Sequence, residues 1–370
     1  ATPAMVDAHG HWSAQIPPSV LQNLPDGTLQ ITASTTDTAG NQVTTPTAHP
    51  VVLDVHYGQT TQATQVQFDN IPNGYINGAA STNMSASGSF EIGSKLTSVV
   101  ITDSRHHQII MNPGDPRLTI DEKTGTFQVH NLNFGNTPEG KLTITATAED
   151  HVGNVSNGTS SAVLDTTPPN TPTVSILTRI SNTQPSMMIH GTPNETIQIF
   201  VDGKSETHNL DGHGKYEFRP TPPTGTSPQV HDYHVTVQAI DNAGNHSAHT
   251  SPQILTFDSE PPVVTIDKIS GDDVLNATEH RQSLNLTGTA VGAEGTAITV
   301  SIHGKDYHPT VDHSGHWQLK VPANDVRALQ DTTSTAPLTI TATAEDRAGN
   351  KSQPASHDLV VDTKASVTID

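Results

Sequence analysis

The sequence predicts an all-β protein made of tandem antiparallel β-sandwich domains that form an elongated rod. Three observations lead to this prediction: a composition suited to short strands, an internal repeat, and Pro-containing segments between the repeats. Aromatic residues make up only 4% of the chain and charged residues 15%, while Thr, Ser, Asn, Gly and Pro are abundant, which is typical of strands joined by many turns. At 370 residues the chain is too long for one ordinary core, so we expect several small domains.

Two sequence marks define the repeat. The first is Asp-x-x-Gly-Asn after an alternating strand, and its Asp falls at Asp37, Asp150, Asp241 and Asp346. The second is an Asp that closes a later apolar strand, at Asp54, Asp165, Asp258 and Asp362. Both marks recur at intervals of about 100 residues, which indicates a tandem array of similar domains.

These marks also set the expected domain boundaries. Residues 55–165, 166–258 and 259–362 are each predicted to form one complete repeat. Residues 1–54 hold only the later strands of a repeat, and residues 363–370 match the start of another one. The natural chain is therefore expected to continue.

The stretch "LTITATAED" occurs twice, at residues 142–150 and 338–346. Its Leu, Ile and Ala residues lie on one face and its Thr residues on the other, the period of a half-buried strand. About seven such runs fit into each repeat, which favours an immunoglobulin-like (Ig-like) antiparallel sandwich.

A third mark, Asp-x-x-Gly-x-aromatic, predicts a tight turn followed by a core side chain. The expected core aromatics are Trp12, Phe127, Tyr216 and Trp317.

The segments between repeats, such as "DTTPPNTP" and "DSEPP", contain Pro. Proline fixes φ and drives the preceding residue toward extended geometry, so we expect short, stiff joints and a rod.

The acids that end these strands predict metal sites at the joints. In an Ig-like sandwich the penultimate strand ends at the pole where the domain's own first strand begins. Asp150 should therefore meet the joint after Asp54, Asp241 the joint after Asp165, and Asp346 the joint after Asp258. Clustered carboxylates need a neutralising cation, and Ca²⁺ takes 6–8 oxygen ligands in irregular geometry. By the repeat rule Asp37 and Asp362 are members of incomplete sites.

A second acidic cluster lies in the fourth repeat, in "IDKISGDDVLNATE". Its candidate Ca²⁺ ligands are Asp267, Asp272, Asp273, Asn276 and Glu279. The second repeat has a thinner version containing Asp69, and the third repeat has lost the acids. The alternative for every one of these residues is a turn, because Asp and Asn bond readily to nearby backbone amides.

Other chemistry is disfavoured. The chain has no Cys, and its formal charge of −20 repels nucleic acid and anionic membranes. No run approaches the length of a membrane-spanning helix. The 21 histidines show no zinc-binding spacing, and no motif of nucleophilic catalysis is present, so we do not expect an enzyme.

The motifs "AEDRAGNKS", "AIDNAGNHS", "VLDTTPP" and "VTIDKISGDDVLNATE" resemble the bacterial Ig-like repeats of giant adhesins exported by type I secretion. The resemblance covers nearly the whole chain. It implies a secreted, extracellular, Ca²⁺-stiffened stalk at the bacterial surface, linked to virulence, that holds a distal binding region for host-cell adhesion. It also implies Ca²⁺ roles for the aspartates at the joints.

Two functions remain open. In the first, the segment is a monomeric structural spacer whose partners are neighbouring repeats of the same chain, with the host surface met through the full-length protein. In the second, one Ig-like domain itself binds a host glycan or protein, for which exposed aromatics such as Tyr233 and Tyr307 are the candidates.

Overall fold

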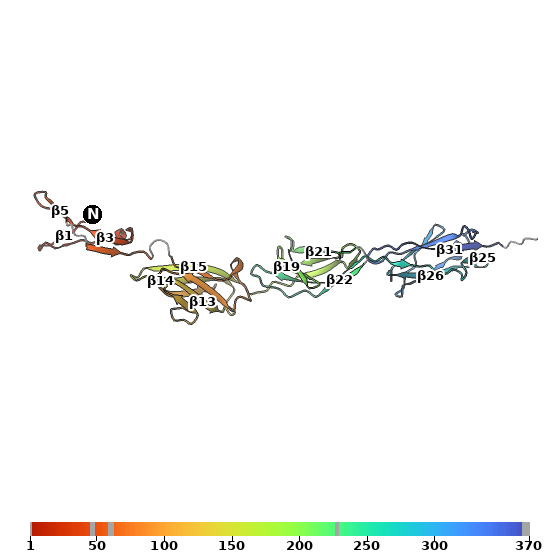
Figure 1. Cartoon of the computed structure of the whole chain (residues 1–370), viewed down its shortest axis with the longest axis horizontal. Coiled ribbons are helices and arrows are strands. Elements are labelled where there is room, and N and C mark those ends of the chain that lie inside the picture. Colours follow the sequence, from red (N-terminus) through yellow and green to blue (C-terminus); the bar gives the residue numbers. More distant parts are fainter. Residues whose placement is uncertain (1, 45–48, 58–62, 226–228, 365–370) are drawn as a thin grey trace, which may run out of the picture. The chain divides into compact units, whose positions relative to one another are not determined.

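The structure is a computed structural model that describes residues 2–44, 49–57, 63–225 and 229–364. It consists almost entirely of antiparallel β-sheets, which confirms the all-β, Ig-like sandwich class (Figure 1). Its helices are single short turns: α1 (Pro18–Leu21), α2 (Ala323–Val326), η1 (Pro72–Gly74) and η2 (Glu279–Arg281). In the described ranges no helix has the length and apolar character needed to span a bilayer.

The second repeat folds as a sandwich of two sheets. The five-stranded sheet has the order β11 (Gln108–Met111), β10 (Lys95–Thr102), β14 (Gly140–Glu149), β15 (Val155–Leu164) and β8 (Tyr75–Ile76). The four-stranded sheet has the order β12 (Leu118–Asp121), β13 (Thr126–Leu132), β9 (Met84–Ser89) and β7 (Gln65–Phe68). All neighbours are antiparallel except β15 and β8, which run parallel.

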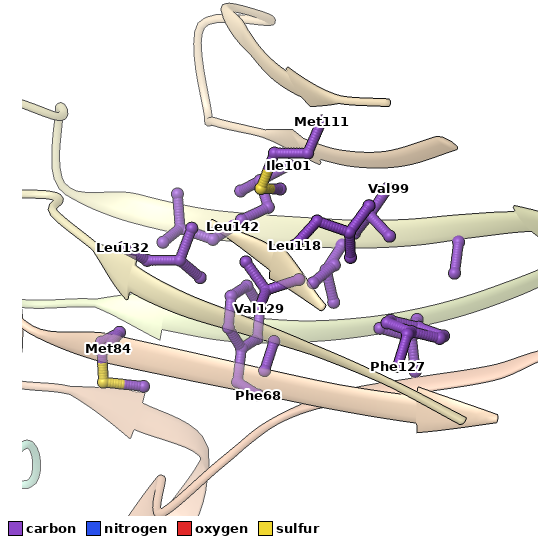
Figure 2. Packing of buried hydrophobic residues seen from close by; sticks show 14 of the residues in the cluster. Phe68, Met84, Val99, Ile101, Met111, Leu118, Phe127, Val129, Leu132 and Leu142 are labelled. Carbon is purple, nitrogen blue, oxygen red and sulfur yellow. The ribbon is translucent and has the colours of Figure 1, made fainter. Parts of the chain in front are cut away.

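The core of this sandwich lies between its two sheets, as Figure 2 shows for side chains such as Phe68, Ile101 and Leu142. The repeated "LTITATA" run contributes Leu142, Ile144, Ala146 and Ala148, all buried, while the intervening Thr residues are only half-buried. The predicted alternation is therefore confirmed.

By contacts the chain divides into two compact units, one of Ala1–Pro168 with Asp241–Asn245, the other of Pro169–Ile240 with His246–Asp370. The turn Asp241–Asn245 thus groups with the second repeat, although it directly follows β22 (Val230–Ile240) of the third.

The third and fourth repeats share one strand order. In the third repeat, the three-stranded sheet has the order β16 (Thr173–Thr178), β18 (Ser186–His190) and β21 (Lys215–Phe218). Its five-stranded sheet has the order β17 (Ile180–Ser181), β23 (Gln253–Asp258), β22, β19 (Thr196–Val201) and β20 (Lys204–Asn209). In the fourth repeat, the three-stranded sheet has the order β24 (Val263–Val264), β26 (Leu284–Val291) and β29 (His316–Val321). Its five-stranded sheet has the order β25 (Val274–Asn276), β31 (Ala355–Asp362), β30 (Leu338–Thr343), β27 (Thr299–Ile302) and β28 (Lys305–Tyr307).

The described residues among the first 54 form only two-stranded sheets. These pair β1 (Met5–Val6) with β2 (Trp12–Ser13), β3 (Gly27–Ile31) with β6 (His49–Leu53), and β4 (Ser34–Thr36) with β5 (Gln42–Thr44). Of the described residues in this segment only Leu53 is fully buried. Trp12 is 49% exposed, so its prediction as a core residue is wrong, because no second sheet covers it in the described chain.

The burial of the other three predicted core aromatics depends on the residue that pairs with each of them on the neighbouring strand. Phe127 and Trp317 are buried and pair across the strands with Gly88 and Gly288, whose missing side chains leave room for the rings. Tyr216 instead pairs with Ile189. It is only half-buried and stacks on His208, with 4.6 Å between ring centroids, so its prediction as a core anchor is only partly met.

A substitution at Gly288 tests this packing. A Cβ at Gly288 would overlap the carbonyl of Thr265 and lie 2.7 Å from Trp317 Cζ2. We expect Gly288→Ala to destabilise the fourth sandwich by about 1–3 kcal/mol through overpacking. Denaturant unfolding followed by Trp317 fluorescence measures it. Gly212→Ala is the control, since a Cβ there meets nothing within 4 Å. Equal midpoints for the two variants would contradict the packing argument.

Candidate functional site at the domain joints

The four Asp-x-x-Gly-Asn segments form the same turn. In each, one carboxylate oxygen of the Asp accepts the backbone N–H of the residues two and four positions later, and the Asn side chain donates to the other oxygen. At Asp346 these three distances are 2.8, 2.9 and 2.9 Å. The Gly has positive φ, +93° at Gly349, which a side chain would strain. These aspartates therefore do form turns, which was the alternative to a metal-binding role.

Three of the turns also reach the joint that precedes their own repeat. Asn154 Nδ2 lies 3.1 Å from Asp54 Oδ1. Asn245 Nδ2 donates to the backbone carbonyl of Asp165 at 2.8 Å, and Asn350 Nδ2 donates to that of Asp258 at 2.9 Å. We call this set of contacts the amide clasp. These three turns therefore reach the preceding joint through the Asn amide, while the predicted metal role of their aspartates stays a prediction.

Further contacts fix the clasp at the second and third joints. Gly78 N–H donates to Asn245 Oδ1 at 2.8 Å, so the carboxamide of Asn245 is bonded at both ends. At the third joint Asn182 N–H donates to the carbonyl of Ala348 at 3.0 Å. These donors sit at the ends of β8 and β17, the short strands that pair in parallel with the last strand of each sandwich.

An acid of the preceding repeat also holds the chain after Asp54, after Asp165 and after Asp362, whereas after Asp258 the N–H of Ser259 donates to the carbonyl of Gln229 at 3.0 Å. Asp26 Oδ1 accepts the N–H of Val55 at 2.9 Å, and Glu139 Oε1 accepts the N–H of Thr166 at 2.9 Å. Asp331 Oδ1 likewise accepts the N–H of Thr363 at 3.0 Å. The Thr363 hydroxyl, then Lys364, lowers the pKa of Asp331 to about 2.

These three acids were not among the residues predicted from the sequence to lie at the joints. A signal was present for two of them, since "PDG" and "PEG" each place the acid one residue before the strand at Gly27 and Gly140.

Electrostatics distinguish the second joint. Burial, followed by repulsion from Asp241 and a smaller contribution from Glu139, raises the pKa of Asp165 above its ordinary value. At the first joint burial alone would raise the pKa of Asp150, but hydrogen bonds led by that of Asn154 hold it below its usual range. At the second joint repulsion therefore adds to burial at Asp165, whereas hydrogen bonds from Thr167 and Thr166 hold the pKa of Glu139 below its ordinary value.

The carboxylates of Asp241 and Glu139 both act electrostatically on Asp165 at the second joint, and oxygen donors of this kind are the type that a hard cation prefers. Each turn aspartate already accepts three hydrogen bonds, which leaves about one of its four lone-pair positions for a metal ion. In the described part of the chain no three His, Cys, Asp or Glu residues form a ready-made metal-binding group.

The acids of the fourth-repeat loop are engaged separately. Asp273 Oδ1 accepts from the N–H of Ile269 at 2.7 Å and lies 2.8 Å from His357 Nε2. Asp272 Oδ1 accepts the N–H of Val274.

The remaining predicted ligands of this loop form a local turn, in which Asn276 Oδ1 accepts the N–H of Thr278 and of Glu279. Asn276 N–H in turn donates to Glu279 Oε2 at 3.1 Å.

Asp267 and Asp69 occupy corresponding positions in two sandwiches. Asp267 Oδ2 accepts the hydroxyl of Thr287 at 2.7 Å, and Asp69 accepts the hydroxyls of Ser85 and Ser87 at 2.7 and 2.6 Å. Both therefore bridge neighbouring strands. Asp258 and Asp362 each accept the N–H two residues later. For all these residues a Ca²⁺ role stays a prediction.

Comparisons with known proteins give structural similarities but no family assignment. No protein-family model matches the chain, and no curated protein matches it in sequence. It is similar to a solved structure of a Ca²⁺-stabilized adhesin with which an Antarctic bacterium reaches out and binds ice, at 22% identity and a TM-score of 0.34, covering 96% of this chain and 86% of that one.

Two further solved structures are similar in the same way. A tetra-tandem repeat in the extending region of a large adhesion protein has 21% identity and a TM-score of 0.33, covering 98% of this chain and 88% of that one. A bacterial immunoglobulin-like domain from the M. primoryensis ice-binding adhesin has 32% identity and a TM-score of 0.22, covering 28% of this chain and 98% of that one. These three structures are parts of bacterial or large adhesion proteins. At these TM-scores, the fold of this chain rests on its own strand pairing.

Removing one clasp should loosen one joint. Asn350→Ala deletes the donors to Asp346 and to the carbonyl of Asp258, so we expect the Asn182 amide to exchange its hydrogen faster. A loss of about 1–2 kcal/mol corresponds to an acceleration of roughly 5- to 30-fold. Amide exchange monitored by NMR gives the rate.

Asn41→Ala is the matched control, because Asn41 closes the same turn without a contact to a joint among the described residues. If Asn182 exchanged equally fast in Asn350→Ala and Asn41→Ala, the clasp would not hold the joint.

Proposed function

We propose that the chain is a structural stalk segment of a large bacterial surface adhesin. In this proposal residues 55–165, 166–258 and 259–362 are successive Ig-like repeats, residues 1–54 the C-terminal part of another, and residues 363–370 the start of a further one. Residues 365–370 of that last segment lie outside the described residues. The observation that carries the proposal is the amide clasp, which occurs at three successive joints.

The clasp supports a spacer role through mechanics. Each joint is fixed on one side by a residue of the sandwich that it leaves, such as Glu139, and on the other by the Asn of the next turn, such as Asn245. Bending at the joint would stretch these hydrogen bonds, and the Pro residues restrict the backbone between them. A chain of such joints acts as a stiff rod that holds a distal binding region away from the cell.

We further propose that Ca²⁺ rigidifies the joints. Asp165, Asp241 and Glu139 would hold it at the second joint, Asp54 with Asp150 at the first, and Asp258 with Asp346 at the third. The cation would offset the carboxylate repulsion that raises the pKa of Asp165. Asp37 and Asp362 would belong to sites completed by further repeats.

The proposed setting follows from the repeat motifs, which resemble the stalk repeats of the Salmonella adhesin SiiE. The protein would be exported by type I secretion and would act outside the cell in host-cell adhesion. The segment would be a monomer whose immediate partners are neighbouring repeats. Its charge of −20 disfavours nucleic acid as a partner.

The alternative function is a domain that binds a ligand through exposed aromatic side chains, and Tyr233 does not fit it. Tyr233 is 6% exposed, and its hydroxyl donates to the carbonyl of Thr221 at 2.6 Å. Tyr307 is half-buried and its hydroxyl donates to Asp325 at 2.9 Å, and burial, followed by this contact, raises the pKa of Tyr307 to about 12. Neither tyrosine offers a free aromatic platform.

Small-angle X-ray scattering of the chain in millimolar Ca²⁺ and after chelation tests the stalk. We expect a long, well-defined maximum dimension in Ca²⁺ and a broader distribution of dimensions after chelation. A stiff chain whose curves do not change would retain the spacer and remove the Ca²⁺ role. A flexible chain under both conditions would contradict the spacer itself.

Substitution of Asp165 separates charge repulsion from metal binding. Asp165→Asn keeps the carbonyl that Asn245 clasps and removes one negative charge, so we expect slightly higher thermal stability without Ca²⁺, by less than about 1 kcal/mol, and a smaller gain on adding Ca²⁺. Calorimetry with and without chelator measures both. Equal Ca²⁺ gains in wild type and variant would exclude Asp165 as a ligand.

The pH dependence of the same pair has a definite sign. Because the pKa of Asp165 is raised in the folded chain, the folded state binds a proton more readily than the unfolded state above pH 3.8. In this window the wild type should gain stability relative to Asp165→Asn as the pH falls. The opposite trend would show that Asp165 is stabilised as a carboxylate.

A further inference from the structure

The outer face of the four-stranded sheet in the second sandwich carries a shallow hollow. It has a volume of about 540 Å³ and lies across β7, β9, β13 and β12. Its floor is formed by the sheet itself, including Gly88 and the edge of Phe127, and polar side chains rise from the strands around it.

Strand register arranges these polar side chains in two rows. The first row crosses the sheet as Gln67, Ser87, Gln128 and Thr119, each directly opposite the next. The second row, two residues along each strand, is Gln65, Ser89, Thr126 and Asp121. Since neighbouring strands lie about 4.8 Å apart, each row spans roughly 14 Å. The face is therefore an ordered grid of amides and hydroxyls with one carboxylate, Asp121, at its corner.

Much of the hydrogen-bonding capacity of this grid is unused. Within the described chain the side-chain amides of Gln65, Gln67 and Gln128 bond to no other protein group, and all three are exposed. Ser87 by contrast is fixed by its bond to Asp69 at 2.6 Å. Free amides on a rigid sheet lose little conformational freedom beyond their own rotamers when they bind a ligand.

The grid is specific to the second repeat. Strand β12 has no counterpart in the described three-stranded sheets β16-β18-β21 and β24-β26-β29, so those faces are narrower. Their outward residues also include charges, such as Lys215 and Glu217 on β21 and Lys320 on β29. A spacer role shared by all repeats does not account for this difference.

We propose that this face binds an uncharged oligosaccharide. A Gln amide donates and accepts at once, and Ser and Thr hydroxyls do the same, which matches a ligand rich in neutral hydroxyl groups. Asp121, Asp69 and the net charge of −20 disfavour anionic sugars. The two rows contain no apolar side chain to anchor a peptide. The segment would then contact a glycan directly, in addition to acting as a spacer.

The test begins with the whole chain on an array of neutral and sialylated oligosaccharides, where we expect binding confined to neutral ones. NMR titration with the best neutral oligosaccharide then gives Kd for the wild type and variants. We expect Gln67→Ala and Gln128→Ala each to weaken binding by about two- to tenfold, the effect of one lost hydrogen bond. Both residues are exposed, so the fold should be unaffected.

Gln318→Ala is the matched control, since Gln318 is an exposed outward residue of β29 in the fourth sandwich. Binding unchanged in Gln318→Ala and weakened in the other two supports the proposal. Absence of neutral-glycan binding, preference for sialylated sugars, or equal Kd in all three variants overturns it. None of these results depends on the scattering test, so the stalk and the glycan face can fail separately.

Discussion

The carboxamide of one Asn in each turn is the interaction on which the joints depend. Only a group with two donors and an acceptor can bond to its own Asp and to the preceding joint at once, as Asn245 does with Asp241 and Asp165 and with Gly78 on its other side. An Asp there would lack the donors, and a Ser would be too short. The same turn thus ends a strand within its repeat and bonds to the chain that enters that repeat.

A metal ion at the proposed sites would compete with the turn's hydrogen bonds for the same carboxylate oxygens. Three of the lone pairs on each turn carboxylate are already used by N–H groups, so an ion meets a partly satisfied ligand. The joints differ in what remains. The second gathers Asp165, Asp241 and Glu139, whereas Asp331 at the end of the fourth repeat is neutralised by Lys364 at 3.0 Å. Joints with the same sequence motif would therefore differ in how strongly they favour a cation, because the nearby charges differ.

Periodicity and topology were enough to predict the sandwiches, the alternation within "LTITATA" and the meeting of each turn with the preceding joint. These features follow from local patterns and one rule about strand ends. The burial of Trp12 and Tyr216 was not predictable in this way, because it depends on a covering sheet and on the residue opposite, Ile189 in place of a Gly. The bonds of the Asn amide and of Glu139 depend on distances between residues 80 and 27 positions apart, so a local pattern such as "PEG" marks the acid but not its partner.

The parallel pairs β8 with β15, β17 with β23 and β25 with β31 have a mechanical consequence. In each sandwich one of these strands follows the point of entry of the chain and the other ends at its exit. Tension along the chain would slide the two strands past each other, with their hydrogen bonds lying across the direction of pull. Such bonds must break together and not one after another. Each sandwich would therefore withstand a pull through shear resistance at the pair of strands nearest the joint.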